Sequence, residues 1–371
     1  MSAGPKSYFT SIIKEAGIEI GGSRPFDVTV HDDRLWARSL SHGTLGFGEA
    51  YMDGWFDTDA LDQLIYKLLE YDIYAHLKPD LGLALSVIRG RLLNLQRSRV
   101  TEVGERHYDI GNDLYAAMLD KRMIYSCGYW AEAGTLDAAQ EAKLDLICRK
   151  VGLQPGMKVL DIGAGLGGFL NFAAARYGIE GVGITISKEQ AAYAEATKGT
   201  LPIETRLMDY MALEGRFDRV ISIGMFEHVG YKNYDAYFRK VRSLLKPDGL
   251  FLLHTIGNNF SSTHGDPWTE KYIFPNGMLP SIQQIATAIE RAFVMEDWHN
   301  FGTDYDRTLM AWWANFDSAW PSLKDKYGER FWRMWRFYLQ VFAAMFRARN
   351  IHLWQVVLSP DGVRGGYRRI S

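Results

Sequence analysis

The sequence predicts an α/β fold: a doubly wound, mostly parallel sheet with helices on both faces, together with a smaller α+β domain at the N-terminus. Strand-like and helical runs alternate from about residue 136 onwards, and a glycine-rich turn follows the first buried run. The first 90 residues instead mix short strand-like and helical pieces. Regular alternation is typical of a parallel sheet, because each crossover helix packs back against the strands that it connects.

Length and composition agree with two folded domains. A chain of 371 residues is too long for one ordinary domain. We expect an N-terminal domain over 1–90, a linker over 91–106 and a larger domain over 107–371. Hydrophobic residues make up 47% and charged residues 23%, the mix of a globular protein. The net charge of −2 gives no global attraction to nucleic acid, so we expect no such partner.

The two cysteines, Cys127 and Cys148, form neither a CxxC pair nor a zinc-ligand spacing, which argues against a disulfide framework. Cys148 shares one face of an expected helix at 136–151 with Leu144, Ile147 and Val151, so we expect it in the core. We find neither a signal peptide nor a run of the roughly 20 apolar residues that a membrane span needs. The protein is therefore expected in the cytoplasm, where it would reach a membrane from its surface.

A basic segment lies between the two expected domains. Arg89, Arg91, Arg97 and Arg99 alternate with apolar residues, and no acidic residue occurs between Asp80 and Glu102. One interpretation is a linker helix with a solvated basic face. The other is a segment that lies on an anionic membrane.

The alternating region contains five strand-like runs, at 158–162, 181–186, 203–208, 217–223 and 250–255. Helical stretches separate them, at 168–176, 188–198 and 233–245. Residues 257–280 then form a long irregular stretch with several glycines and prolines, which predicts a lid or a binding loop. Two more helices and a final strand-like run at 351–358 close the chain, and in the N-terminal part residues 61–71 predict a helix.

The strongest local motif is VLDIGAGLGG at 159–168, where a buried strand is followed by a glycine-rich turn and a helix. The acidic residue Asp161 lies just before the glycines. The glycines are Gly163, Gly165, Gly167 and Gly168. Glycine lets the backbone turn tightly and lets a ligand approach it closely. The turn follows the carboxyl end of a strand, where open α/β sheets bind ligands.

A dinucleotide-binding dehydrogenase is a competing interpretation of this turn, because Gly163, Gly165 and Gly168 satisfy the GxGxxG pattern. Two features count against it. Asp161 precedes the glycines, and the next strand ends in Thr-Ile-Ser at 185–187, with no acid to hold a ribose diol.

Six further stretches narrow the interpretation. They are HYDIGNDLYAAMLD (107–120), MIYSCGYW (123–130), GMFEHVG (224–230), HTIG (254–257), KYIFPNGMLPS (271–281) and DWHNFGTDYDRTLMAW (297–312). Together with the glycine turn they resemble the bacterial cyclopropane-fatty-acyl-phospholipid synthases and the related mycolic acid cyclopropane synthases. The resemblance runs over nearly the whole chain, including an N-terminal domain that the mycolic relatives lack. It implies the Rossmann-like fold of S-adenosylmethionine methyltransferases, with a seven-stranded sheet.

The resemblance also implies a site for S-adenosylmethionine as the cosubstrate. The matching residues are Tyr125, Ser126, Asp161, Gly163, Gly165, Gly167, Thr185, Ser187, Gln190, Asp209 and Tyr210. Asp209 follows the third strand, where the family meets the adenine, but a helix N-cap is the alternative for this residue. Ala164 and Leu166 stand where close relatives often have Cys and Trp, which leaves the packing of the cosubstrate open.

The reaction implied is the transfer of a methyl carbon to the double bond of an unsaturated phospholipid acyl chain, with ring closure. The family is understood to hold a bicarbonate ion as the base. The matching positions are Cys127, Glu227, His254, Ile256 through its backbone, and Tyr305. As single residues, His254 would suit a core and Glu227 a helix cap. We interpret Cys127 as a neutral ligand of the ion.

Aromatic side chains in these stretches could shield a carbocation, although core packing is the simpler explanation for each. They are Tyr125, Tyr129, Trp130, Phe226, Tyr272, Phe274 and Tyr305. Two other functions stay open: a lipid C-methyltransferase with a branched product, and a non-enzymatic lipid-binding protein. The family resemblance further implies a homodimer, associated peripherally with the inner face of the cell membrane.

Overall fold

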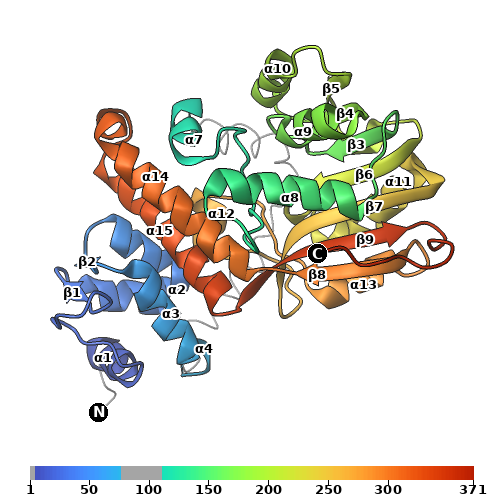
Figure 1. The fold of residues 1–371 in the computed structure, drawn as a ribbon. Coiled ribbons are helices and arrows are strands. Elements are labelled where there is room, and N and C mark those ends of the chain that lie inside the picture. The colour runs from blue at the N-terminus through green and yellow to red at the C-terminus, as the bar shows by residue number, and fades with distance from the viewer. Residues whose placement is uncertain (1–4, 77–110) are drawn as a thin grey trace. The chain divides into compact units, whose positions relative to one another are not determined.

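The computed structural model describes residues 5–76 and 111–371 (Figure 1). The basic segment and the linker expected at 91–106 lie outside these residues. The chain forms two compact units. The described part of the first, the N-terminal unit, comprises 5–76, Gly265–Pro275 and Leu309–Asn350. The second, the sheet unit, comprises Gly111–His264, Asn276–Thr308 and Ile351–Ser371.

The sheet unit contains a seven-stranded, mostly parallel sheet, in the order β5-β4-β3-β6-β7-β9-β8. Its strands are β3 Lys158–Ile162, β4 Glu180–Thr185, β5 Ile203–Leu207, β6 Phe217–Ile223, β7 Leu245–Asn258, β8 Val294–Asn300 and β9 Ile351–Ser359. β3 to β7 pair in parallel, and β9 runs antiparallel to both of its neighbours, β7 and β8. This confirms the predicted fold class.

Helices cover both faces of this sheet. The helices of the sheet unit are α7 Asn112–Met118, α8 Leu136–Lys150, α9 Gly168–Tyr177, α10 Lys188–Thr197, α11 Tyr234–Leu244 and α13 Ile282–Ile289. Side chains of α8 and α9 form one buried core with the sheet, in which Cys148 is fully buried as expected. Side chains of α11 and α13 form a second core on the opposite face. The central strands β3, β6, β7 and β9 therefore lie between two apolar layers, which explains the apolar runs in their sequences.

One strand was not predicted from the sequence. β8 lies at the edge of the sheet, and the residues of its sequence VMEDWHN that are buried are Asp297 and His299. The Lys150 ammonium of α8 lies 3.3 Å from Asp297 Oδ2 and 3.0 Å from His299 Nδ1. The alternation of β8 is real, but its buried side is polar, so hydrophobicity alone does not reveal it.

The N-terminal unit is mainly helical. Its elements are α1 Pro5–Glu15, β1 Thr29–Val30, α2 Arg34–Met52, β2 Phe56–Asp57, α3 Leu61–Glu70, α4 Ile73–His76, α12 Pro267–Tyr272 and α15 Glu329–Arg347. The helix α14, Thr303–Tyr327, begins in the sheet unit and continues in this unit. The helix expected at 61–71 is confirmed as α3. The units do not follow the expected division at 1–90 and 107–371, because α12 and α15 pack with α2 and α3.

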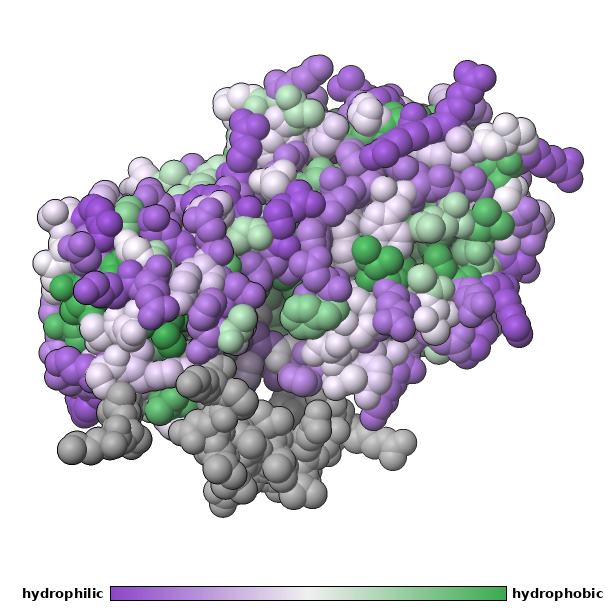
Figure 2. Space-filling view, turned by 90° about the horizontal axis from the view of Figure 1, so that it is seen from below, coloured by the Kyte–Doolittle hydropathy of each residue, from purple (hydrophilic) through white to green (hydrophobic). Residues whose placement is uncertain are grey.

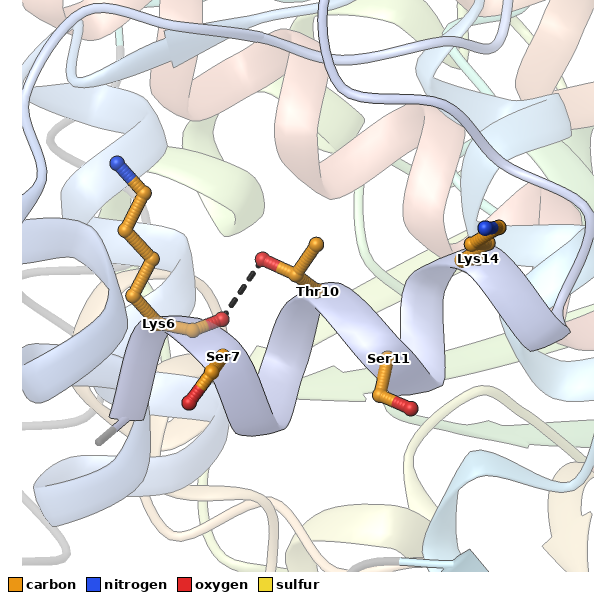
Figure 3. Close-up of a pocket in the computed structure, with 5 residues that line it drawn as sticks. All are labelled: Lys6, Ser7, Thr10, Ser11 and Lys14. Atoms are coloured by element: carbon orange, nitrogen blue, oxygen red, sulfur yellow. Dashed lines mark hydrogen bonds between the residues drawn. The ribbon is translucent and has the colours of Figure 1, made fainter. Parts of the chain in front are cut away.

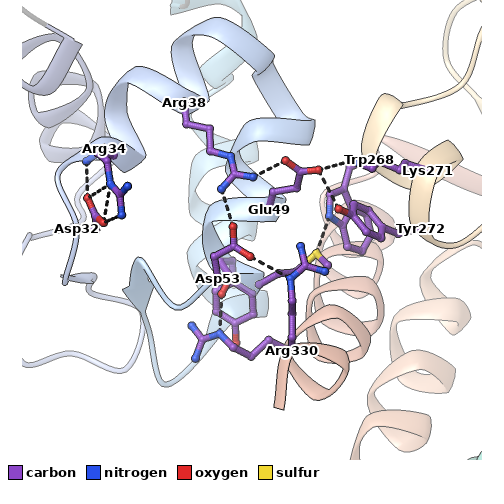
Figure 4. Close-up of polar contacts among 12 residues, drawn as sticks. Asp32, Arg34, Arg38, Glu49, Asp53, Trp268, Lys271, Tyr272 and Arg330 are labelled. Atoms are coloured by element: carbon purple, nitrogen blue, oxygen red, sulfur yellow. Dashed lines mark hydrogen bonds and ion pairs between the residues drawn. The ribbon is translucent and has the colours of Figure 1, made fainter. Parts of the chain in front are cut away.

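Polar contacts attach α12 to α2 within the N-terminal unit (Figure 4). Glu49 Oε1 accepts hydrogen bonds from Lys271 Nζ at 2.6 Å and from the Tyr272 hydroxyl at 2.8 Å. Arg38 binds Glu49 Oε2 at 2.5 Å and Asp53 Oδ2 at 2.7 Å. Burial acts to raise the pKa of Glu49, but the hydrogen bonds from Lys271, Tyr272 and Arg38 lower it to about 2. Residues 267–272 of the expected lid, 257–280, thus form the helix α12, which these contacts attach to α2.

Candidate active site

The glycine-rich turn joins β3 to α9 at the carboxyl edge of the parallel strands. Gly163, Gly165 and Gly167 have φ angles of 81°, 55° and 83°, which favour glycine. The amides of Gly163 and Ala164 both donate to Ile184 O at 3.0 Å, so β4 fixes the turn. A Cβ on Gly163 would lie 2.7 Å from Met225 Cγ. A side chain therefore has no room at the first glycine of this turn, whereas a Cβ added at Gly165 would meet no described atom within 4 Å.

Ala164, one of the two departures from the family pattern, packs against the neighbouring strand. Ala164 is buried, and a Cβ added at Gly183 would lie 2.9 Å from the Cβ of Ala164. Leu166 is only partly buried. The smaller residue at 164 thus fits closely against β4 beneath the turn.

Asp161 lies buried at the end of β3. Burial raises its pKa to about 7, and the charge of Lys143 acts against this increase. Its Oδ1 accepts no hydrogen bond from the part of the chain that the structure describes. A buried carboxylate oxygen without a partner is costly unless a ligand satisfies it. Asp161 therefore fits a ligand-binding role at this edge of the sheet.

The polar residues after β4 form a local network. Thr185 Oγ1 donates to Gln190 Oε1 at 2.8 Å, and Ser187 Oγ caps α10 by accepting from Gln190 N at 3.3 Å. Ile186 between them is 57% exposed. Residues 185–187 include no acid, although the Glu189 carboxylate accepts a hydrogen bond from Ser187 Oγ at 3.1 Å. The three polar side chains are placed together, and their contact with a cosubstrate stays a prediction.

Asp209 follows β5, and its side chain caps the short helix Tyr210–Ala212 by accepting from Met211 N at 2.7 Å. The N-cap alternative for this residue is therefore confirmed, while its contact with adenine stays a prediction. Tyr210 packs edge-on against Tyr237 at 5.3 Å, and burial raises its pKa to about 12. Asp209 therefore caps the short helix that begins with Tyr210, and the Tyr210 ring is packed against the core at this edge of the sheet.

Two polar residues of α8 donate hydrogen bonds to Ser126. Gln140 Nε2 donates to Ser126 O at 2.7 Å, and Lys143 Nζ donates to Ser126 Oγ at 2.8 Å. The preceding residue, Tyr125, packs its ring edge-on against Tyr115 of α7 at 5.3 Å. The sequence analysis missed Gln140 and Lys143. Their spacing with Ile147 and Lys150 follows one helical face and could have revealed them.

Glu227 and Ile256 are in direct contact. Glu227 follows β6, and its Oε1 accepts a hydrogen bond from Ile256 N at 2.7 Å. Burial raises the pKa of Glu227 to about 7, and the bond from Ile256 opposes this increase. Among the described residues, none donates to Glu227 Oε2, which is also buried. One oxygen therefore fixes the side chain, and the other remains available as an acceptor.

His254 lies on β7, next to the end of β6. Burial lowers its pKa well below the ordinary value, so the ring is neutral. Gln355, the facing residue on β9, donates from Nε2 to His254 Nδ1 at 3.3 Å. The ring proton must then lie on Nε2, since a neutral imidazole carries only one. Nε2 is buried and has no hydrogen-bond partner among the described residues, so it can donate to a small anion.

Cys127 is fully buried, and burial raises the pKa of its thiol well above the ordinary value. The thiol donates to Gly128 O at 3.1 Å. A neutral thiol agrees with our interpretation of Cys127 as a ligand and argues against a nucleophile, which needs the thiolate.

Thr308 joins the Cys127 segment to α14, the helix that carries Tyr305. Its Oγ1 accepts from Gly128 N at 3.1 Å and from Trp130 Nε1 at 2.8 Å. Asp304 of the same helix accepts from Trp130 N at 2.6 Å. Tyr305, next in the chain, is buried in the first turns of α14. These bonds keep the start of α14 beside residues 127–130, and they were not foreseen from the sequence.

A chain of aromatic rings links this segment to His254. The Tyr129 ring lies 5.3 Å from that of Phe301, which in turn lies 6.0 Å from the His254 ring. Phe301 therefore lies between the segment that carries Cys127 and the strand that carries His254. The five predicted residues come from two groups, Glu227 with His254 and Ile256, and Cys127 with Tyr305.

The other aromatic candidates have structural partners. Phe226 is fully buried in the core and stacks on Tyr234 at 4.2 Å. The Arg307 guanidinium lies 4.6 Å from the Trp130 ring. Tyr272 and Phe274 belong to the N-terminal unit. For Phe226 in particular, packing in the core is its evident role.

A hollow of about 610 Å³ lies on α1, away from all of these residues in the sequence (Figure 3). It is lined by Lys6, Ser7, Thr10, Ser11 and Lys14. Lys6 pairs with Asp33 at 2.8 Å, and Thr10 donates to Lys6 O at 2.7 Å. Because Lys6 and Thr10 already have protein partners and none of the predicted site residues lines it, this hollow is not part of the candidate site.

The seven-stranded sheet and the glycine turn with its preceding acid define the class of protein: an S-adenosylmethionine-dependent methyltransferase. The family model for mycolic acid cyclopropane synthetase matches residues 95–356. The chain belongs to this family.

Individual relatives agree with this assignment. The cyclopropane-fatty-acyl-phospholipid synthase of Escherichia coli K12 is 51% identical over 358 residues, covering 96% of this chain and 94% of that protein. A probable fatty acid methyltransferase of Pseudomonas putida is 36% identical and covers 68% and 67%.

Solved structures of the family share the fold. The cyclopropane synthase MmaA2 from Mycobacterium tuberculosis matches with a TM-score of 0.65 and 31% identity, over 69% of this chain and 97% of that one. The mycolic acid cyclopropane synthase CmaA1, complexed with S-adenosylhomocysteine and CTAB, matches with a TM-score of 0.64, 31% identity and the same coverage.

Proposed function

We propose that the enzyme builds a cyclopropane ring across the double bond of an unsaturated phospholipid acyl chain. The observation that carries the proposal is the burial of Glu227 and His254, each with one polar atom that no described residue contacts by a hydrogen bond. The 51% identity to the Escherichia coli synthase, over almost the whole of both chains, supports the choice of substrate.

In this reaction the alkene attacks the methyl group of S-adenosylmethionine, the carbon–sulfur bond breaks, and S-adenosylhomocysteine leaves. The resulting carbocation loses a proton from the transferred methyl group as the ring closes. An alkene is a weak nucleophile, so the methyl group must be held close to it in a site without water. The burial of Asp161, Glu227 and His254 at this edge of the sheet supports such a site.

A bicarbonate ion fits the residues that are present. His254 Nε2 supplies a donor and Glu227 Oε2 an acceptor that no described residue contacts, while Ile256 N holds the other oxygen of Glu227; a neutral Cys127 thiol and the Tyr305 hydroxyl complete the proposed set. When bound, the ion would supply the base for the proton of the carbocation. Glu227, by accepting the hydroxyl proton of the ion, would orient it and increase its basicity.

Glu227→Gln tests this proposal, because the change is nearly isosteric but adds a donor where an acceptor is needed. We expect turnover to fall by about 10²–10⁴-fold, the usual worth of a positioned acid–base group. The affinity for S-adenosylhomocysteine should stay unchanged. Removal of bicarbonate should slow the wild type strongly and the variant little. Full wild-type activity without bicarbonate would refute this base.

A lipid C-methyltransferase is a second candidate, since relatives of that kind also match. The tuberculostearic acid methyltransferase UfaA1 of Mycobacterium tuberculosis is 31% identical over 89% of this chain and 82% of that protein. Proton NMR of lipids from cells that express the enzyme separates the two products. Ring protons of a cyclopropane support our proposal, whereas a methylene or methyl branch without them identifies the alternative.

We further propose that the enzyme works as a homodimer in the cytoplasm, bound peripherally to the inner face of the membrane. Among the described residues, no helix is long and apolar enough to span a bilayer. On the face shown in Figure 2, hydrophobic residues are interspersed with hydrophilic ones in each unit. The membrane proposal therefore depends on Arg89, Arg91, Arg97 and Arg99, which lie outside the described residues.

Binding to anionic vesicles tests the membrane proposal. Each basic contact with such a surface contributes about 1 kcal/mol and is screened by salt. Binding should weaken as salt is raised and when the four arginines are replaced by glutamine. Salt-independent binding that survives these replacements would exclude the basic segment as the attachment.

A further inference from the structure

Lys143 is a buried lysine that neither the family motifs nor the proposed reaction uses. It lies on α8 with 0% of its surface exposed. Its ammonium donates to Ser126 Oγ at 2.8 Å, one residue before Cys127. Burial of an ammonium costs several kcal/mol unless hydrogen bonds and opposite charges compensate. A lysine in this position therefore needs an explanation beyond packing.

The direction of this hydrogen bond is fixed by chemistry. A lysine ammonium has three donors and no acceptor, so Ser126 Oγ must accept. The proton of the Ser126 hydroxyl is then directed elsewhere, and Ser126 can act as a donor to a ligand. Gln140 holds the carbonyl of the same residue at 2.7 Å, so the backbone of Ser126 cannot turn freely.

The charges around Lys143 belong to the same edge of the sheet. Burial lowers its pKa to about 8, and the negative charges of Asp120 and Asp161 oppose this decrease. Asp161 is the carboxylate before the glycine turn, and Lys143 provides the charge that favours its ionised form. Lys143 therefore contacts the serine directly, and its charge also favours the ionised form of the aspartate that the sequence assigns to the cosubstrate site.

We propose that Lys143 is a positioning residue for S-adenosylmethionine: it orients the Ser126 hydroxyl to donate to the carboxylate of the cosubstrate. The carboxylate is the only anionic group of S-adenosylmethionine, and so the only one that a hydroxyl donor and a nearby cation both favour. The inference rests on the proposed placement of the cosubstrate at Ser126 and Asp161.

Calorimetry with S-adenosylhomocysteine tests this role without the lipid reaction. Lys143→Met keeps the length of the side chain but removes its charge and donors, and we expect its Kd to rise about tenfold or more. The Michaelis constant for S-adenosylmethionine should rise with it, while kcat changes little. A folded Lys143→Met protein with wild-type affinity would overturn the proposal.

Lys150 offers a matched control on the same helix. It is equally buried, and its ammonium contacts His299 and Asp297 rather than Ser126. Lys150→Met removes a buried lysine of α8 in the same way, so it should reduce thermal stability comparably but leave the Kd for S-adenosylhomocysteine unchanged. An equal rise in Kd for both variants would show a general structural effect and contradict the specific role of Lys143.

Ser126→Ala shows whether Lys143 acts through the serine and also serves if Lys143→Met does not fold. Ser126→Ala alone should raise the Kd by a similar factor, and unchanged affinity would reject the role of the hydroxyl. Combined with Lys143→Met, the effects should be clearly less than additive. If the wild type itself failed to bind S-adenosylhomocysteine, the proposed site would fail rather than the role of Lys143.

Discussion

The two oxygens of Glu227 have different surroundings. Oε1 accepts the backbone amide of Ile256 at 2.7 Å, whereas Oε2 is buried and no described residue donates to it. The hydrogen bond to Oε1 sets the orientation of the carboxyl group. Burial raises the pKa of Glu227 above its value in water. One residue thus combines a fixed geometry with a perturbed proton affinity, as is typical of functional sites.

The raised pKa predicts that Glu227→Gln stabilises the ligand-free protein. The native state binds the proton up to a pKa of about 7, but the ordinary value is 4.5. Wild-type stability therefore falls as pH rises from about 4.5 to 7, and the glutamine variant avoids this loss. Above pH 7 its advantage should reach about 3 kcal/mol, at ~1.4 kcal/mol per pKa unit.

Chemical denaturation over a pH series measures this difference. At pH 4 the two proteins should be nearly equally stable, which is the internal control. Equal stability at pH 8 would show that Glu227 is not held in a costly ionised state.

Gln355 gives a second prediction, through the tautomer of His254. Gln355→Glu replaces the donor at His254 Nδ1 by an acceptor, so the ring proton should move to Nδ1 and Nε2 should no longer donate. We expect turnover to fall about 10²-fold, with unchanged affinity for S-adenosylhomocysteine. Gln355→Met imposes no tautomer and is the control. A Met variant as inactive as the Glu variant would argue against this role.

At the scale of elements, α8 serves both packing and the site. Leu144, Ile147 and Cys148 belong to the core, as the sequence predicted. Lys143 and Lys150 are buried too, which simple amphipathic analysis assigns to the solvent face. The partners of each lysine lie outside the helix, so local periodicity can show the helical face that the lysines share but not the contacts that accommodate them.

The turn between β3 and α9 predicts that Gly163→Val abolishes binding of S-adenosylhomocysteine. Valine resists the φ of 81°, and its Cβ would collide with Met225. Gly156→Val is the control, because Gly156 has a φ of 78° but no atom within 4 Å of an added Cβ. Calorimetry should find binding lost only in the first variant. Binding by a folded Gly163→Val protein would show that the ligand site is elsewhere.

The elements were predictable where both sides of a strand are apolar. β3 and β6 have the expected bounds, β4 is shifted by one residue at both ends, and β5 ends one residue earlier than expected. Long-range pairing accounts for the failures, since β8 buries Asp297 and His299 only because α8 supplies Lys150. For the site, motifs gave the residue types, but the supporting contacts of Thr308, Gln355 and Lys143 depend on the folded chain.

At the scale of the whole molecule, the N-terminal unit is assembled from separate parts of the sequence. The Phe337 ring of α15 lies 6.0 Å from Phe47 and 5.7 Å from Tyr51 of α2. Arg333 of the same helix donates to Tyr51 O at 2.5 Å. No local pattern says which unit a helix joins, so the sequence analysis placed α15 with the larger domain.

A chain that begins at Gly111 should therefore be much less stable than the full chain. It retains α15 but lacks α2 and α3, so aromatic side chains such as Phe337 would be exposed to water. We expect aggregation in size-exclusion chromatography, or a clearly lower Tm by circular dichroism. If the shortened chain were a monomer with the Tm of the full chain, α15 would not share one core with α2 and α3.

The discontinuous N-terminal unit also has a consequence for synthesis on the ribosome. Residues 5–76 emerge first, but the helix that completes their core, Glu329–Arg347, emerges near the end of translation. Until then the apolar faces of α2 and α3 have no permanent cover. Most of the sheet unit has been translated by that time, although its last strand, β9, comes later still. The part of the enzyme that is made first is therefore completed only when most of the chain has been made, and a nascent chain stalled in between would present its open core to chaperones and proteases.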